Sequence, residues 1–118
     1  GIVVGGGGTT HGNDGPWNVI RNNIIVNSDD GIGVFKKTHN TIIDRNSLIN
    51  IKKRAIRIES GSDAAHIWNN RIDNYGATAI ILKDSKNGSI FKNTFIKGKG
   101  DAIKQYNSKN YRIDENVP

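Results

Sequence analysis

The sequence predicts an all-β fold in which short strands coil into a stack of parallel rungs. One layout recurs along the 118 residues: an isoleucine, an asparagine three residues later, an apolar residue two further on, and then a small residue followed by alternating aliphatic residues. A fixed period marks a repeat architecture, in which stacked copies bury one continuous core. The repeated asparagines stand 23, 24, 23 and 23 residues apart, at Asn23, Asn46, Asn70, Asn93 and Asn116.

The composition sets limits on the class of protein. There is no cysteine, which excludes a disulfide framework or a thiolate metal site. No apolar run approaches the roughly 18 residues of a membrane helix, and no signal peptide opens the chain, so no membrane partner is expected. The net charge of +6 favours acidic partners, which could be polyanionic sugars, nucleic acid or acidic surfaces. Methionine is absent, including at position 1, so we expect a processed or internal piece of a longer chain. Neither end shows a polar cap, so we expect the native molecule to continue beyond one or both ends.

Pairs of aliphatic residues at positions i and i+2 predict the strands that face the core. This alternation, rich in β-branched residues, is typical of strands with one buried face, and no helical apolar stripe competes with it. Asn, Gly, Ser, Asp and Lys fill the segments between and predict turns. Stacked rungs would lie about 4.8 Å apart. The inward pairs are Ile32/Val34, Ile56/Ile58 and Ile80/Leu82.

The repeated asparagines predict a recurring tight bend. Asparagine tolerates the left-handed backbone region, and stacked amides can bond to each other along a column. An unpaired buried amide would cost about 1–3 kcal/mol, so we expect each amide to bond to the next. A second column lies four residues later, at Asn27, Asn50 and Asn74, and becomes Lys97.

The frame I-x-x-N-x-[I/L/F], followed by [G/A]-I-x-aliphatic, resembles the right-handed parallel β-helix repeats of the pectate-lyase-like superfamily. The resemblance covers Gly1 to Pro118 and implies a single domain of about five rungs of 23–24 residues. That superfamily includes polysaccharide lyases, glycosidases, epimerases and phage tailspikes. Its polymer substrates commonly lie along a groove on one sheet, parallel to the helix axis, although a fold alone does not establish an activity.

A glycine-rich insertion spans residues 5–17. Gly1–Val4 aligns with Gly31–Val34, which leaves seven extra residues before Asn23. No G-K-[S/T] follows, so a P-loop is rejected. The insertion, with His11 and Asp14, is either one wall of a binding site or a simple crossover.

Two acidic residues in the first full rung form a candidate Ca²⁺ site. Asp29 and Asp30 stand one rung from Lys53 and Arg54, so Asp29 should lie beside Lys53 and Asp30 beside Arg54. The simpler interpretation is cross-rung ion pairing, because Ca²⁺ usually needs more than two carboxylates. In the functional interpretation, Lys53 or Arg54 takes a proton from the substrate.

Outward side chains between the inward pairs form a candidate substrate strip. Cations pair with carboxylates and aromatic rings pack on sugar faces, so the mixture suits a sugar acid. The alternative is an ordinary soluble face balanced by cross-strand pairs. One column holds Gly33, Arg57, Ile81 and Lys104, and its neighbour holds Phe35, Glu59, Lys83 and Tyr106.

A third candidate lies in the turn that leaves this strip. His39 and Asp63 occupy equivalent positions, followed by Lys86 and Lys109 in later rungs. The insertion belongs to the same turn one rung earlier, so His11 and Asp14 could overhang His39. A histidine–carboxylate contact is a plausible acid/base unit, whereas histidines in polar turns are more often solvated. His66 falls in another register and joins neither group.

These observations favour a secreted, carbohydrate-active β-helix that acts on or binds an acidic polysaccharide. The candidate enzyme classes are polysaccharide lyase and glycoside hydrolase. As a lyase, it would use Arg57, Lys83 or Arg54 to neutralise the substrate carboxylate and His39, Lys53 or Arg54 as the base that removes the α-proton. Ca²⁺ is the candidate cofactor. The alternative is a non-catalytic structural or adhesive segment of tailspike type. Nucleic acid is not favoured, because acids interrupt the basic residues. Open ends predict continuation into further rungs or self-association.

Overall fold

The computed structural model of the chain describes residues 1–5 and 18–118. His11, Asp14 and the rest of the predicted insertion beyond Gly5 lie outside the described residues. The described residues form fourteen short strands and no helix, which confirms the all-β class. Within them, no helix is long and apolar enough to cross a membrane.

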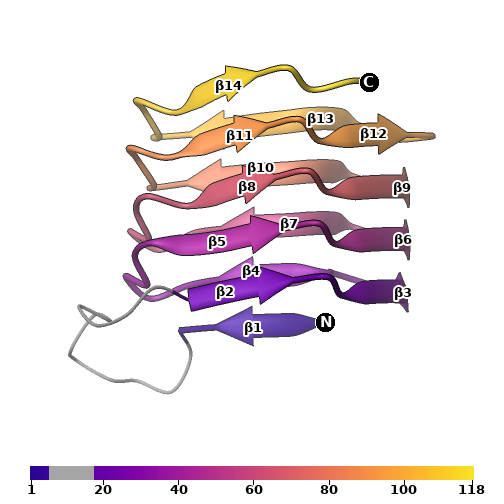
Figure 1. The fold of residues 1–118 in the computed structure, drawn as a ribbon, viewed down its shortest axis with the longest axis horizontal. Helices are drawn as coiled ribbons and strands as arrows, with labels where there is room; N and C mark the ends of the chain where they lie inside the picture. Colours follow the sequence, from indigo (N-terminus) through magenta and orange to yellow (C-terminus); the bar gives the residue numbers. More distant parts are fainter. Residues whose placement is uncertain (6–17) are drawn as a thin grey trace.

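The strands form three sheets, each built of parallel strands, which we call sheets A, B and C. All three sheets run along the stack (Figure 1). Each sheet takes one strand from each rung, so strands that are neighbours in a sheet are distant in sequence. Sheet A consists of β1 (Ile2–Val4), β4 (Ile32–Val34), β7 (Arg54–Ile58), β10 (Thr78–Lys83) and β13 (Asp101–Tyr106). Sheet B consists of β2 (Asn18–Arg21), β5 (Thr41–Asp44), β8 (His66–Trp68), β11 (Ser89–Phe91) and β14 (Arg112–Asp114). Sheet C consists of β3 (Ile24–Ser28), β6 (Ser47–Ile51), β9 (Arg71–Tyr75) and β12 (Thr94–Ile96).

One rung takes its strands from sheets B, C and A in chain order. The strand register follows the sequence repeat, because Ile32 pairs with Ile56, Ile56 with Ile80 and Ile80 with Ile103. The described residues contain four complete rungs, from β2 to β13. They are flanked by β1, which belongs to a preceding rung, and by β14, which begins a fifth.

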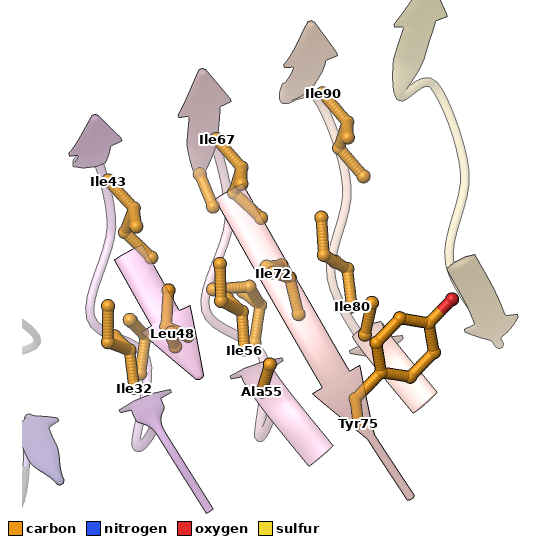
Figure 2. Close-up of a cluster of buried hydrophobic side chains, with 14 of the residues drawn as sticks. Ile32, Ile43, Leu48, Ala55, Ile56, Ile67, Ile72, Tyr75, Ile80 and Ile90 are labelled. Carbon is orange, nitrogen blue, oxygen red and sulfur yellow. The ribbon is translucent and has the colours of Figure 1, made fainter. Parts of the chain in front are cut away.

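The aliphatic residues predicted to face inward form the core (Figure 2). All six members of the predicted pairs are fully buried, and further columns from sheets B and C meet them. Burial of each isoleucine or leucine side chain contributes roughly 1.5–3 kcal/mol. The additional columns include Ile43, Ile67 and Ile90 from sheet B, and Leu48, Ile72 and Phe95 from sheet C.

The five repeated asparagines form the predicted ladder inside the stack. In the first four, the backbone N–H and the Nδ2 both donate to the Oδ1 of the asparagine one rung further on, at 2.9–3.1 Å. Nδ2 also donates to a backbone carbonyl of the preceding rung, as Asn70 does to Ile43 at 2.9 Å. Every interior amide is therefore paired, which makes its burial tolerable.

The prediction that the ladder asparagines adopt the left-handed backbone themselves is wrong. The left-handed residue is the one before each ladder asparagine, with φ between 55° and 58°, at Asn22, Arg45, Asn69, Lys92 and Glu115. This residue turns the corner between sheets B and C, and its own side chain stays outside the ladder. The ladder position requires the side-chain amide of asparagine, whereas the bend position before it accepts asparagine, arginine, lysine or glutamate.

The second asparagine column does lie in the left-handed region, as predicted. Its φ values are 55° to 58°, and the naturally substituted Lys97 keeps the same backbone. Here the amides stack on the outside, with Asn50 donating to Asn27 at 3.0 Å and Asn74 donating to Asn50 at 2.8 Å. These exposed bonds contribute less than those of the buried ladder, because water competes for the same groups.

Candidate functional site

The outward strip predicted from the sequence lies on sheet A. Strand register places Arg57 between Gly33 and Ile81, and Ile81 beside Lys104. The neighbouring column pairs Lys83 directly with Tyr106. The structure therefore gathers the predicted substrate-binding residues of the described chain on one face of one sheet.

The charge of Arg57 is already compensated within the chain. Its Nε donates to Glu59 at 2.8 Å, its Nη1 lies 3.4 Å from Asp30, and its guanidinium carbon lies 5.1 Å from the centre of the Phe35 ring. The hydrogen bond that Arg57 donates to Glu59 is the main reason that the pKa of Arg57 is raised. A substrate carboxylate at this point would have to displace Glu59 or Asp30.

Asp30 lies among cations. One oxygen lies 3.4 Å from Arg54 Nε and accepts the Arg54 backbone N–H at 3.2 Å, and the other faces Arg57. The ion pair predicted between Asp30 and Arg54 is thus confirmed. Asp29 does lie beside Lys53, whose backbone N–H donates to the Asp29 carbonyl at 2.8 Å. The predicted ion pair with Lys53 is wrong, because the Asp29 carboxylate lies 4.0 Å from Lys52 Nζ instead.

Among the described residues, Asp29 and Asp30 do not belong to a larger acidic cluster. Within the described ranges, no group of three or more histidine, aspartate or glutamate side chains is placed to hold a metal ion. Ca²⁺ usually takes six to eight oxygen ligands, several of them carboxylates. Asp29 and Asp30 are instead placed as turn residues that pair with the cations of the next rung.

The last two rungs carry the accessible cations of the strip. Lys83 and Tyr106 are exposed, and Lys83 has no ion pair within the described part of the chain. Lys104 is partly exposed and lies 3.8 Å from Asp101, an exposed pair that contributes little. From Thr78 to Pro118 the sequence holds eight lysines and arginines against four carboxylates.

A hollow adjoins this end of sheet A. It measures about 460 Å³ and lies in the turn that connects sheet A to sheet B. Lys86 and Lys109 stand on successive rungs of this turn and pair through a β-bridge. The lining residues are Gly61, Asp63, Asp84, Ser85, Lys86, Asn107, Ser108 and Lys109.

His39 contacts Asp63 in the same turn, as the column predicted. Its Nδ1 accepts the Asp63 backbone N–H at 3.0 Å and lies 4.0 Å from the carboxylate, whose Oδ1 accepts the Lys86 backbone N–H at 3.1 Å. Because Nδ1 is the acceptor, neutral His39 carries its proton on Nε2. The lone pair needed by a general base is therefore already engaged.

The candidate bases lie at opposite ends of the strands of sheet A. Arg54 opens β7 and follows directly on Lys53, whereas His39 lies in the turn that follows the strands of this sheet. A five-residue strand is about 16 Å long. His39 and Arg54 are therefore alternatives and do not act on one substrate atom together.

Sequence reasoning missed a cluster on the outer face of sheet B. His66 Nδ1 lies 2.7 Å from Ser89 Oγ, and Trp68 Nε1 donates to the same oxygen at 2.8 Å. Arg112 packs over the Phe91 ring, with the guanidinium carbon 5.3 Å from its centre. Burial lowers the pKa of His66. The signal was present, since these residues flank the inward isoleucines of β8 and β11.

Fold and site together define a parallel β-solenoid with one sheet face that grows more basic toward its C-terminal rungs. Residues 1–117 match a family model described as right handed beta helix region, so the chain belongs to the right-handed β-helix family. The resemblance and the fold predicted from the sequence are thereby confirmed. Neither the comparison with curated proteins nor that with solved structures gave a match.

Proposed function

We propose that the protein binds an acidic polysaccharide outside the cell, along the outer face of sheet A in its last two rungs. The observation that carries the proposal is the grouping of Lys83, Lys104 and Tyr106 on β10 and β13. The ammonium groups of Lys83 and Lys104 are accessible, whereas the charge of Arg57 is already neutralised by Glu59. The accessible cations, and not the arginine, are the groups that can meet an incoming carboxylate.

The spacing of these groups suits a polymer. Neighbouring rungs lie about 4.8 Å apart, and Lys83 and Lys104 present two positive charges on successive rungs, in neighbouring columns of the strip. Tyr106 supplies an aromatic ring beside them, which packs well on the apolar face of a sugar. Lys86 and Lys109 extend the basic surface into the adjoining hollow.

Binding, and not bond cleavage, is the activity that we propose. Neutral His39 has its acceptor nitrogen engaged by the Asp63 N–H, and Arg54 is paired with Asp30. A general base must have an available lone pair within reach of the proton it removes. Lys53 is exposed, but it precedes the strands of sheet A, whereas the hollow lies beyond their C-terminal ends.

The experiment compares a charged and a neutral polysaccharide. Calorimetric titration with oligomers of a uronic acid should show binding that weakens with salt, and a neutral oligomer of the same length should not bind. Replacing Lys83 and Lys104 by Ala should weaken binding about five- to thirtyfold, since each of the two exposed pairs is worth about 0.5–1 kcal/mol. Tyr106→Ala should weaken it without any change in net charge.

The matched control removes the same charge elsewhere. Lys52 and Lys99 line a different hollow, at the turn between sheets C and A, and their double replacement by Ala should leave the affinity unchanged. Equal weakening by both double variants would refute a localised site. Absence of any binding would favour a structural or adhesive role, and release of unsaturated products would show a lyase.

A further inference from the structure

The hollow beside sheet A is lined by charges of both signs. Lys86 and Lys109 contribute ammonium groups from successive rungs, and Asp63 and Asp84 contribute carboxylates. Within the described part of the chain, Lys86, Lys109 and Asp84 make no ion pair, whereas the carboxylates of the first rungs are paired with arginines. The hollow therefore presents both a cation and an anion to a ligand.

The signs of these charges alternate along the turn that follows β10. Lys83 ends the strand, Asp84 stands at the bend with φ of 53°, and Lys86 follows two residues later. Asp84 is exposed, and its Oδ1 accepts a hydrogen bond from Asn107 Nδ2 on the next rung at 2.7 Å. That bond positions the carboxylate between the two lysines of its own rung.

A ligand with negative charges alone does not complement this hollow. A polymer that extends from Lys83 into the hollow passes Asp84, and a further carboxylate at that point would be repelled. Asp63 adds a second negative charge, with its side chain 29% exposed and its Oδ1 held by the Lys86 backbone N–H at 3.1 Å. An ammonium group between two carboxylates would instead meet a partner of opposite sign at each step.

We propose that the hollow takes an amino sugar, so that the polysaccharide bound along sheet A carries free ammonium groups as well as carboxylates. The ammonium pairs with Asp84, and the carboxylates on either side of it pair with Lys83 and with Lys86 or Lys109. The hollow measures about 460 Å³, which lies within the roughly 300–1,000 Å³ of ligand sites. This inference rests on the proposed function, because it names the substrate class of the same site.

The test compares two ligands that differ only at the amine. An alternating oligomer of glucuronic acid and glucosamine is titrated by calorimetry with its amines free and with its amines acetylated, at a mildly acidic pH that keeps the amines charged. The net charge of +6 by itself favours the acetylated form, which carries only negative charges. The free-amine form should nevertheless bind at least as tightly, because Asp84 pairs with its ammonium.

Asp84→Asn removes the charge and keeps the fold of the bend. Asparagine retains the oxygen that accepts from Asn107, and it tolerates the left-handed backbone. The variant should bind the free-amine form about two- to fivefold more weakly, the effect of one exposed ion pair, and the acetylated form no more weakly than before. Asp29→Asn is the matched control, because Asp29 is exposed at the turn between sheets C and A, and it should change both affinities by the same factor.

The outcomes separate this inference from the proposed function. Weaker binding of the free-amine form to the unaltered chain, or an equal response of both forms to Asp84→Asn, would overturn the amino-sugar inference and leave acidic-polysaccharide binding intact. An unchanged affinity for the acetylated form after replacement of Lys83 and Lys104, with the Asp84→Asn effect still present, would overturn the proposed function alone. If neither form binds, both fail together.

Discussion

The buried asparagine ladder gives the sharpest test of what holds the rungs together. In Asn70→Ala four hydrogen bonds disappear: those from Asn70 Nδ2 to Ile43 and Asn93, and the two from Asn46. Asn70 is only 1% exposed, so water cannot replace its amide without opening the stack. The Asn46 backbone N–H and the Ile43 carbonyl are both left without this partner.

The expected loss follows from those two backbone groups. Each unsatisfied buried group costs about 1–3 kcal/mol, so the variant should lose about 2–6 kcal/mol of unfolding free energy. A typical domain has only about 5–15 kcal/mol in total. The loss should appear as a large fall in the urea midpoint, measured by circular dichroism and interpreted with the slope of each transition.

Asn50→Gly is the matched control on the exterior column. Its amide bonds are exposed, and its φ of 58° suits glycine. The change should stay within about 0.5 kcal/mol. A loss below about 1 kcal/mol for Asn70→Ala, or an equal loss for both variants, would refute the view that amide satisfaction in the interior sets the stability.

Three further changes probe other parts of the stack. A Cβ added in Gly76→Ala would overlap the backbone carbonyl of Lys52, so the variant should lose at least about 1–3 kcal/mol by urea titration, and an unchanged midpoint would contradict the close rung contact. Asp44→Asn removes the charge of a nearly buried carboxylate that Arg21 contacts at 2.9 Å, so the variant should lose about 1–3 kcal/mol of unfolding free energy in the same assay. An unchanged unfolding free energy would argue against a structural role for the pair. Burial lowers the pKa of His66 below the ordinary 6.5, so the unfolded chain takes up the proton first; the stability from this group is complete above about pH 6.5 and declines as the pH falls. Thermal unfolding across that range should show a flatter profile for His66→Gln, and an unchanged profile would assign the effect to other groups.

The interior was predictable because the repeat fixes it. An isoleucine three residues before an asparagine, repeated every 23 or 24 residues, determines both the inward columns and the ladder, and Ile43 with Asn46 lies where the pattern requires. The bends were less predictable. Arg45 and Lys92 adopt the left-handed region although neither residue type signals it, because the corner is imposed by the stacked backbone and not by the side chain.

The exterior was predictable in position but not in contact. Alternation placed Arg57 outward on sheet A, yet only the rotamers show that Glu59 and Asp30 hold it. Lys52, and not Lys53, meets Asp29 because adjacent residues of a turn point in different directions. The same alternation would have placed His66 on sheet B, had it been applied to the residues that flank Ile67.

The continuous columns restrict how such a molecule can change in size. Removing one whole repeat would bring every inward side chain onto an equivalent neighbour, so the interior would be preserved. Removing one residue from a strand would turn its remaining side chains to the opposite face and expose the aliphatic ones. Insertions and deletions are therefore tolerable in whole rungs or at corners, and the length of the solenoid can change only in steps of one rung.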